Sequence, residues 1–111
     1  MLTLGQKQRK FTLMIGELIL YAYSQGYELT FGEAWRPPET AEAYARAGKG
    51  IANSLHIDRL ALDLNLFRNG KWLQKTEDFR LLGEWWESRG GTWGGRFGDG
   101  NHFSLEHLGV K

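Results

Sequence analysis

The 111-residue sequence predicts a small α+β domain in which a mostly antiparallel sheet is flanked by helices. Three observations support this fold class. Apolar residues near the N-terminus recur with the period of a helix, alternating segments flank an Asn-Gly pair, and the predicted order is helix, strand, helix, strands, helix, strand. The length fits one domain over residues 1–111, without an internal repeat or linker. The fifteen glycines and two prolines indicate many tight turns.

The first helix is predicted over residues 7–25, because apolar side chains fall at 11, 14, 15, 18, 19 and 22 and Gly26 can end it. Residues 27–35 alternate and are rich in strand-forming residues. Pro37 and Pro38 then forbid continuation of a sheet ladder. We therefore expect a strand that delivers Trp35 and Arg36 to a turn.

The middle of the chain predicts a short helix over residues 39–47, which is rich in Ala and Glu and follows the prolines. Residues 60–67 alternate as a second strand, and Asn69-Gly70 predicts a hairpin with a return strand from Trp72. Thr76 is the expected N-cap of a helix that runs to Ser88. That helix would carry Phe79, Leu82, Trp85 and Trp86 on its core side.

The C-terminal third contains the stretch 93–100, which is too rich in glycine for a regular element, and a last strand is expected over 101–105. Across the whole chain the net charge is only +1, which argues against nucleic acid as a partner. Without cysteine, any metal must be held by His, Asp or Glu. The sequence contains no run of about 18 apolar residues, the length that a membrane span requires. The basic and apolar N-terminal segment imitates a signal peptide, but Glu17 interrupts its apolar run. We therefore expect a protein made in the cytoplasm without its own export signal.

His56, Asp63 and His102 can together supply three ligands to one zinc ion, with the fourth position left for water. A continuous strand would separate residues 56 and 63 by about 23 Å, too far for a shared ion. A helix would bring them within about 10.5 Å, but the alternation over 60–66 argues against helix. We therefore predict a bend near residues 57–59, with Asp63 on the strand that follows and His102 on a neighbouring strand.

Asp99, three residues before His102, is the acid of the site that is not needed as a metal ligand. A carboxylate beside a metal-activated water can take the proton of that water and pass it to a leaving amine. Arg36 could stabilise an oxyanion or hold a substrate carboxylate. Asp58 is the alternative to Asp63 as a ligand, but it lies in the predicted bend. Glu106 and His107 match no motif position and are expected to be solvated.

Two strings, Ser-x-His-x6-Asp at 54–63 and Trp-Gly-Gly-x-Phe followed by Asp-x-x-His-Phe at 93–103, resemble the M15-type zinc peptidases of bacterial cell-wall metabolism. The similarity extends from about Phe31 to Leu105 and is greatest to phage L-alanyl-D-glutamate peptidase endolysins. It implies a fold like that of hedgehog-type domains and D,D-peptidases. It also implies that His56, Asp63 and His102 bind Zn²⁺, that Asp99 is the general base and acid, and that Arg36 and Ser54 contact the substrate.

Two positions depart from the usual pattern of this family. Arg59 stands where many members have glycine, and the acid at 99 is aspartate, as in the endolysin branch, where other branches use glutamate. By the same resemblance, the enzyme would wait in the cytoplasm until a holin opens the membrane and would then act on the cell wall, as a monomer. From their aromatic character and position, Trp93 and Trp35 are candidates for a wall of the substrate groove, and Trp85 or Trp86 for its lining.

The residues predict a metal-dependent hydrolase, and the resemblance implies a zinc metallopeptidase that hydrolyses the L-Ala to D-Glu bond of the peptidoglycan stem peptide. Cleavage between two D-Ala residues by the same chemistry is the first alternative. A non-catalytic zinc-stabilised domain that binds the cell wall is the second, although structural zinc sites are usually closed by four protein ligands. A nuclease suggested by Asn101-His102 lacks the basic surface that such an enzyme needs.

Overall fold

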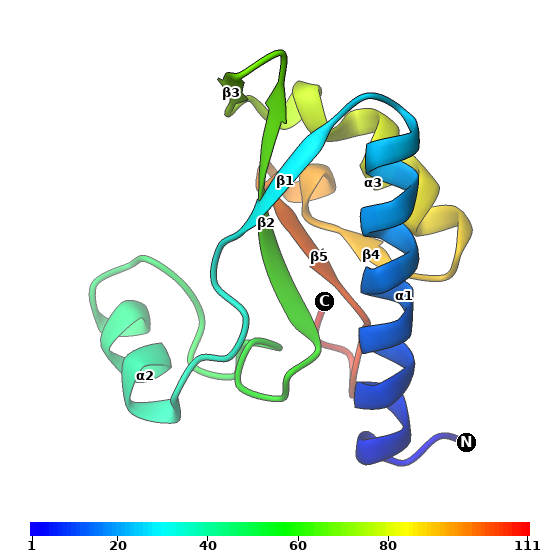
Figure 1. Cartoon of the computed structure of the whole chain (residues 1–111). Coiled ribbons are helices and arrows are strands. Elements are labelled where there is room, and N and C mark those ends of the chain that lie inside the picture. Colours follow the sequence, from blue (N-terminus) through cyan, green and yellow to red (C-terminus); the bar gives the residue numbers. More distant parts are fainter.

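The first helix, α1 (Leu4–Ser24), runs along one face of an antiparallel sheet in the computed structural model, which describes residues 1–111 (Figure 1). Helix α1 begins at Leu4, three residues before the predicted start at Lys7, because Thr3 caps it. The Thr3 hydroxyl accepts from the backbone of Gln6, and the Gln6 side chain accepts from the backbone of Thr3. The helix ends before Gly26, whose φ of 84° suits glycine, as predicted. No helix of the chain is long and apolar enough to span a membrane.

The sheet is antiparallel throughout, which confirms the predicted fold class. Its strands are β1 (Glu28–Phe31), β2 (Ala61–Arg68), β3 (Lys71–Leu73), β4 (Thr92–Trp93) and β5 (His102–Ser104). They are ordered β1-β2-β5-β4, and β3 pairs with the far end of β2. Asn69 and Gly70 both have positive φ in the β2–β3 turn, which is the conformation that the Asn-Gly pair predicts.

Strand β2 lies at the centre of the sheet and separates the core from the opposite face. Leu62, Leu64 and Leu66 are buried beneath α1 and α3, whereas Asp63 and Asn65 alternate with them and point to the other side. One strand therefore supplies both the floor of the core and a polar row on the open face.

The remaining helices are α2 (Pro38–Arg46), the 3₁₀ turn η1 (Thr76–Phe79), α3 (Arg80–Ser88) and the 3₁₀ turn η2 (Gly94–Phe97). Thr76 is not an N-cap as predicted, because its hydroxyl accepts a hydrogen bond from the backbone of Gly100. Asp78 instead caps the turn by accepting from the backbone of Lys75. The stretch 93–100 is expected to be irregular, but it contains the end of β4 and the turn η2, in which Gly95 leaves room for the Trp93 ring.

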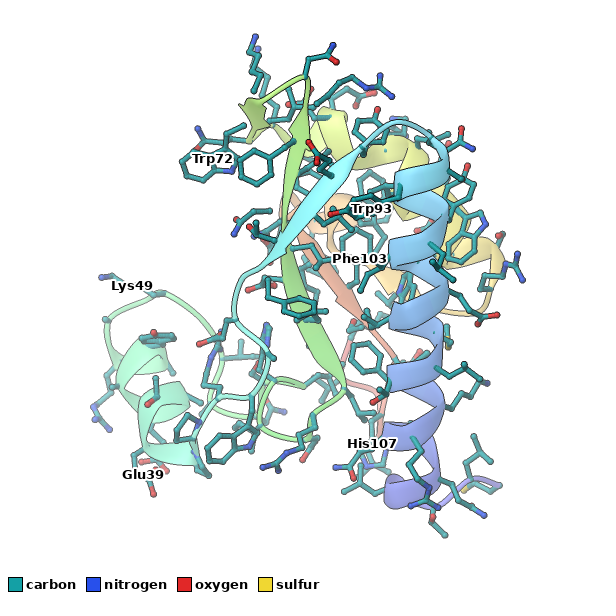
Figure 2. The ribbon with its side chains drawn as sticks, in the orientation of Figure 1. Glu39, Lys49, Trp72, Trp93, Phe103 and His107 are labelled. Carbon is teal, nitrogen blue, oxygen red and sulfur yellow. The ribbon has the colours of Figure 1, made fainter.

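The core contains Trp86, Trp93 and Phe103. Figure 2 shows Trp93 and Phe103 between the sheet and helix α1. The Trp86 ring meets both Phe11 and Phe103 edge-on, and its indole nitrogen donates to the carbonyl of Ser104. Trp93 is only 1% exposed and donates to the carbonyl of Gly100. The prediction that Trp93 forms a wall of a substrate groove is therefore wrong, because a fully buried ring cannot contact substrate.

Candidate metal centre

His56, Asp63 and His102 come together on the open face of the sheet, and the ligand atoms that they offer all lie within 4.8 Å of one another. His56 Nε2 lies 3.5 Å and His102 Nδ1 lies 3.3 Å from Asp63 Oδ1. Bonds of about 2.0–2.1 Å in a tetrahedral site place neighbouring ligand atoms about 3.3 Å apart. Both distances from Asp63 match this spacing, and the two histidine nitrogens, which lie within 4.8 Å of each other, complete a cluster that can hold one metal ion.

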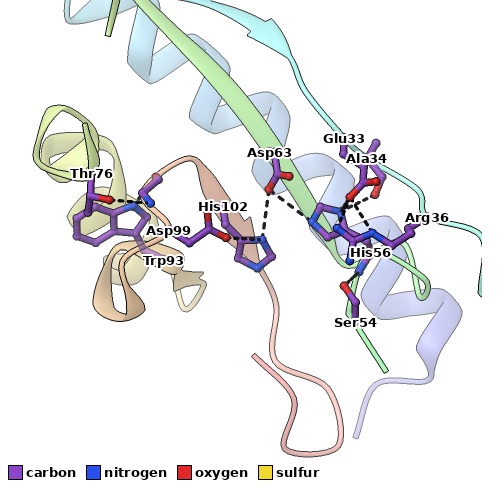
Figure 3. A network of polar contacts seen from close by, with 11 residues as sticks. Glu33, Ala34, Arg36, Ser54, His56, Asp63, Thr76, Trp93, Asp99 and His102 are labelled. Carbon is purple, nitrogen blue, oxygen red and sulfur yellow. Dashed lines mark hydrogen bonds and ion pairs between the residues drawn. The ribbon is translucent and has the colours of Figure 1, made fainter. Parts of the chain in front are cut away.

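His56 is delivered by a compact turn over residues 55–59, which is the predicted bend. The backbone nitrogen of Arg59 donates to the carbonyl of His56, and Arg59 itself has a φ of 55°. His56 Nδ1 lies 2.8 Å from the carbonyl oxygen of Ala34 (Figure 3). Because that carbonyl can only accept, Nδ1 carries the proton and Nε2 is left as the ligand atom.

Asp63 and His102 face each other across the β2–β5 pair as directly opposed residues. Such neighbours lie close enough on one sheet face for their side chains to meet. His102 turns Nδ1 toward Asp63, whereas its Nε2 is buried and has no hydrogen-bond partner. The pairing of two adjacent strands thus fixes two of the three candidate ligands.

Asp99 lies at the rim, where its Oδ2 is 4.0 Å from His102 Nδ1 and its side chain is 54% exposed. The backbone carbonyl of Asp99 accepts from the nitrogen of His102, so the acid is tied to the ligand that follows it. Gly94 allows this approach, since a Cβ there would lie only 2.3 Å from the carbonyl oxygen of Asp99. The carboxylate is thus held beside the ligand cluster.

The site shifts the ionisation of three of its groups. Burial would lower the pKa of His56, but hydrogen bonds with Asp63 and Ala34 and the charge of Asp63 raise it above 6.5 overall. Burial opposes ionisation of Asp63, yet hydrogen bonds from both histidines lower its pKa to about 2. Burial raises the pKa of Asp99, the charge of His102 lowers it, and the neighbouring Asp63 carboxylate raises it again, so the net shift of the Asp99 pKa is upward.

These groups open into a cavity of about 480 Å³ that also contains Ser54, Arg36, Lys49 and Lys111. Ser54 is buried and its hydroxyl accepts from the backbone of His56, so it supports the ligand as well as lining the cavity. Arg36 is held by an ion pair with Glu33 and lies over the ring of Tyr44. Three basic side chains therefore line the same cavity as the two acids, Asp63 and Asp99.

The cavity contains residues that sequence reasoning missed, namely Lys49, Ile51, Phe97 and Lys111. Lys49 and Ile51 lie in the loop after α2, where no periodic pattern indicates which side chains line a cavity, and Figure 2 shows Lys49 at the outer edge of this loop. Phe97 is exposed and lies near the His102 ring in the glycine-rich segment. No signal in the sequence identifies these positions.

Other candidates lie outside the site. Asp58 does not join the ligand cluster, and its carbonyl accepts from Gln8. His107 contacts Lys7 near the start of α1, so it is partly buried and not fully solvated as expected. Trp35 is 46% exposed but lines a separate apolar cavity with Phe11 and Ile15, and Trp86 is fully buried. These positions do not contribute to the candidate metal centre.

A buried His-Asp-His cluster with a free carboxylate beside it defines the kind of site that metal-dependent hydrolases use. A family model of M15-type peptidases, described as D-alanyl-D-alanine carboxypeptidase, matches residues 47–105, which include all four of these side chains. The chain belongs to this peptidase family. Among curated protein sequences, none matches this chain significantly.

Solved structures that match this chain share its fold, among them two peptidases. The first is the L-Ala D-Glu endopeptidase ChiX of Serratia marcescens, with a TM-score of 0.75 and 18% identity over 88% of this chain and 79% of ChiX. The second is a vancomycin-resistance D,D-pentapeptidase, VanY from a VanB-type cassette, solved with Zn(II). It gives a TM-score of 0.63 and 16% identity over 89% of this chain and 72% of VanY. These likenesses confirm the predicted fold.

Proposed function

We propose that this protein is a zinc-dependent peptidase that hydrolyses an amide bond in the stem peptide of peptidoglycan. The observation that carries the proposal is the convergence of His56, Asp63 and His102 beside the unligated carboxylate of Asp99. Both similar structures are peptidases by name, and one was solved with Zn(II). A zinc ion bound there would polarise the substrate carbonyl and lower the pKa of a water molecule toward neutrality.

The residues of the chain divide the remaining work. Asp99 takes a proton from the attacking water and returns it to the leaving amine, and its raised pKa suits a group that must do both. Arg36, oriented by Glu33, faces the cavity where substrate charge would lie. Because the stem peptide carries carboxylates, the basic side chains Lys49 and Lys111 favour it over a neutral peptide.

Three protein ligands beside an open cavity favour catalysis over a purely structural role for the metal. Structural zinc sites are usually closed by four protein ligands, whereas catalytic sites keep one position open. The cluster here contains three candidate ligands, and it opens to a cavity of about 480 Å³. We therefore place the wall-binding, non-catalytic alternative second.

Replacement of Asp99 by Asn tests the chemical part of the proposal. Asp99→Asn keeps the shape of the side chain but cannot accept a proton, so kcat should fall by about 100-fold or more while zinc content is unchanged. Asp58→Asn, outside the cluster, is the matched control and should keep full activity. Release of new amino groups from purified peptidoglycan measures the rate, and chelation should abolish it. An Asp99→Asn enzyme with full activity would refute the assigned role.

We further propose that the bond cut is the one between L-Ala and D-Glu, as in phage endolysins. The resemblance of the two sequence motifs and the fold shared with ChiX support this bond, whereas the description of the matching family favours cleavage between two D-Ala residues. Mass spectrometry of digested peptidoglycan distinguishes the two. A free L-Ala carboxyl group supports the endopeptidase, and loss of one terminal D-Ala supports the carboxypeptidase.

The resemblance to phage endolysins also supports a proposal about where the enzyme acts. We propose that it is a monomer that stays in the cytoplasm until a holin opens the membrane. Expression of the protein in bacteria should then leave cells intact, and co-expression with a holin should lyse them. Lysis without a holin would refute this route.

A further inference from the structure

A second cavity begins where the metal-centre cavity ends, and Asp99 lines both. This second cavity, which we call the amide trough, has a volume of about 210 Å³. Its polar lining consists of Asn65, Gln74, Thr76, Asp99 and Asn101, and the ring of Trp72 forms one side. The volume suits a single sugar ring or one peptide unit.

The register of the sheet places the amide trough in line with the metal centre. Asp63, Asn65 and Phe67 alternate along β2 on the open face, and Trp72 on β3 is directly opposite Phe67. At about 3.3 Å per residue, Asn65 lies about 7 Å from Asp63 along β2. The Phe67–Trp72 pair lies about 13 Å from Asp63 in the same direction. Figure 2 shows Trp72 projecting from β3 at the end of the sheet away from His107.

The two cavities differ in charge. The metal-centre cavity contains Arg36, Lys49 and Lys111, whereas the amide trough contains no basic residue and only one acid, the shared Asp99. Asn65 donates to Thr30, so its carbonyl oxygen remains available as an acceptor. Trp72 is 53% exposed and offers a flat apolar surface. An acidic ligand suits the first cavity, and a neutral ligand with hydroxyl and amide groups suits the second.

We propose that the amide trough binds the sugar ring of the glycan strand to which the stem peptide is attached. This inference rests on the proposed function and deepens it. The ring would lay its C–H face on Trp72 and direct its hydroxyl and acetamide groups to Asn65, Gln74 and Asn101. The enzyme thus recognises the glycan and the acidic peptide on opposite sides of Asp99.

The spacing identifies the bond that can be cut with the sugar in the trough. A lactyl ether and one L-Ala residue separate the sugar from the bond to D-Glu, a span of about 7 Å. Three further residues would move the sugar about 10 Å farther from a terminal D-Ala bond. Only the shorter span matches the trough, which lies about 7–13 Å from Asp63 along β2.

A comparison of two substrates tests the proposal. One is the stem peptide alone, and the other is the same peptide on its N-acetylglucosamine–N-acetylmuramic acid disaccharide. Zinc-loaded enzyme should cleave the disaccharide peptide with a kcat/KM about tenfold higher, in keeping with one aromatic stacking contact and its hydrogen bonds. Trp72→Ala should remove this preference and leave the rate on the free peptide unchanged. Tyr23→Ala, which removes a similarly exposed ring from α1, should keep it. Equal rates on both substrates, or an equal loss on both in Trp72→Ala, would overturn the proposal.

A binding measurement separates this inference from the proposed function. The disaccharide without peptide is titrated into the isotope-labelled, zinc-loaded protein while the indole and side-chain amide resonances are recorded. Shifts at Trp72, Asn65 and Gln74 in the native protein, with the two amide shifts lost in Trp72→Ala, support the trough even if no peptide is ever cleaved. Peptide cleavage without such shifts would leave the peptidase intact and refute the sugar site.

Discussion

At the scale of single residues, His56 shows how a candidate metal ligand is oriented by an atom outside the ligand cluster. The Ala34 carbonyl fixes the Nδ1 proton, so Nε2 faces Asp63. That carbonyl belongs to the loop after β1, and the loop is held by a hydrogen bond from the nitrogen of Arg36 to the carbonyl of His56. The two segments that flank the site therefore hold each other in place.

Arg59 carries a conformation that glycine tolerates better, since its φ of 55° crowds a Cβ. Its guanidinium lies over the Trp35 ring, so a direct comparison with glycine would mix two effects. Arg59→Gly and Arg59→Ala both lose the guanidinium and differ mainly in the strained Cβ. We expect the glycine variant to be more stable than the alanine variant by about 1 kcal/mol in chemical denaturation. A more stable alanine variant would show that the turn is not strained.

The sequence could predict that His56, Asp63 and His102 converge, because each belongs to a motif and because a shared ion demands a bend between His56 and Asp63. It could not place Trp93, because a glycine-rich segment has no period that shows which face is buried. It missed Lys49 for the same reason. The roles of such residues depend on how loops pack, which local patterns do not encode.

At the scale of elements, the segment between β4 and β5 positions the proposed acid. Gly94 begins this segment, and a Cβ at this position would collide with both the Asp99 carbonyl and the His102 side chain. The chain changes direction at Gly98, which follows η2 and has a φ of 80°. The spacing of acid and ligand is therefore set by close backbone packing and not by a rigid helix or strand.

Gly94→Ala should have two effects, a displacement of Asp99 and a loss of stability of the fold. Its new Cβ would lie 2.3 Å from the Asp99 oxygen and 2.7 Å from the His102 Cβ. We expect a loss of about 1–3 kcal/mol in unfolding free energy and a marked loss of activity. Gly16→Ala on α1, where nothing lies within 4 Å of the added Cβ, is the control. Normal stability and activity in Gly94→Ala would mean that the segment can relax freely.

At the scale of the whole molecule, a bound metal should link the turn before β2 to β2 and β5, because its ligands come from all three. An ion that binds only the folded state adds stability that grows with its concentration, by about 3 kcal/mol at a hundredfold excess over Kd. Zinc should therefore raise Tm by about 10 °C at neutral pH.

The size of this zinc shift should depend on pH. The raised pKa of His56 means that its protonation stabilises the metal-free fold below about pH 6.5, and that this stabilisation is lost as pH rises through the folded-state pKa. Zinc requires the neutral ring, whereas Asp63, with a pKa of about 2, stays ionised throughout. The increase in Tm should be small near pH 5.5 and large near pH 8, as measured by calorimetry. His107→Gln should keep this pattern, and His56→Gln should abolish the shift. A zinc-induced increase in Tm that is equal at both pH values would contradict the predicted pH dependence.

Most helices and strands of the fold could be predicted from the sequence, because hydrophobic periodicity and the Asn69-Gly70 turn act locally. The order of strands β1-β2-β5-β4 was not predicted, since pairing between distant strands depends on the complete core. The pairing of Asp63 with His102 was the exception, because a shared ion required their strands to be neighbours.

The alternation along β2 constrains how this protein can change during evolution. Insertion of one residue within β2 before Asp63 would turn the leucines outward and the polar row inward, so it would destroy the core and the site at once. Substitutions on the open face can alter specificity while the leucines keep the fold. Changes in length can instead be absorbed at the exposed turn over residues 68–71, beyond the last buried leucine. Relatives with new specificities should therefore differ in the side chains of this strand and in the length of its hairpin turn, and not in the length of the strand up to Leu66.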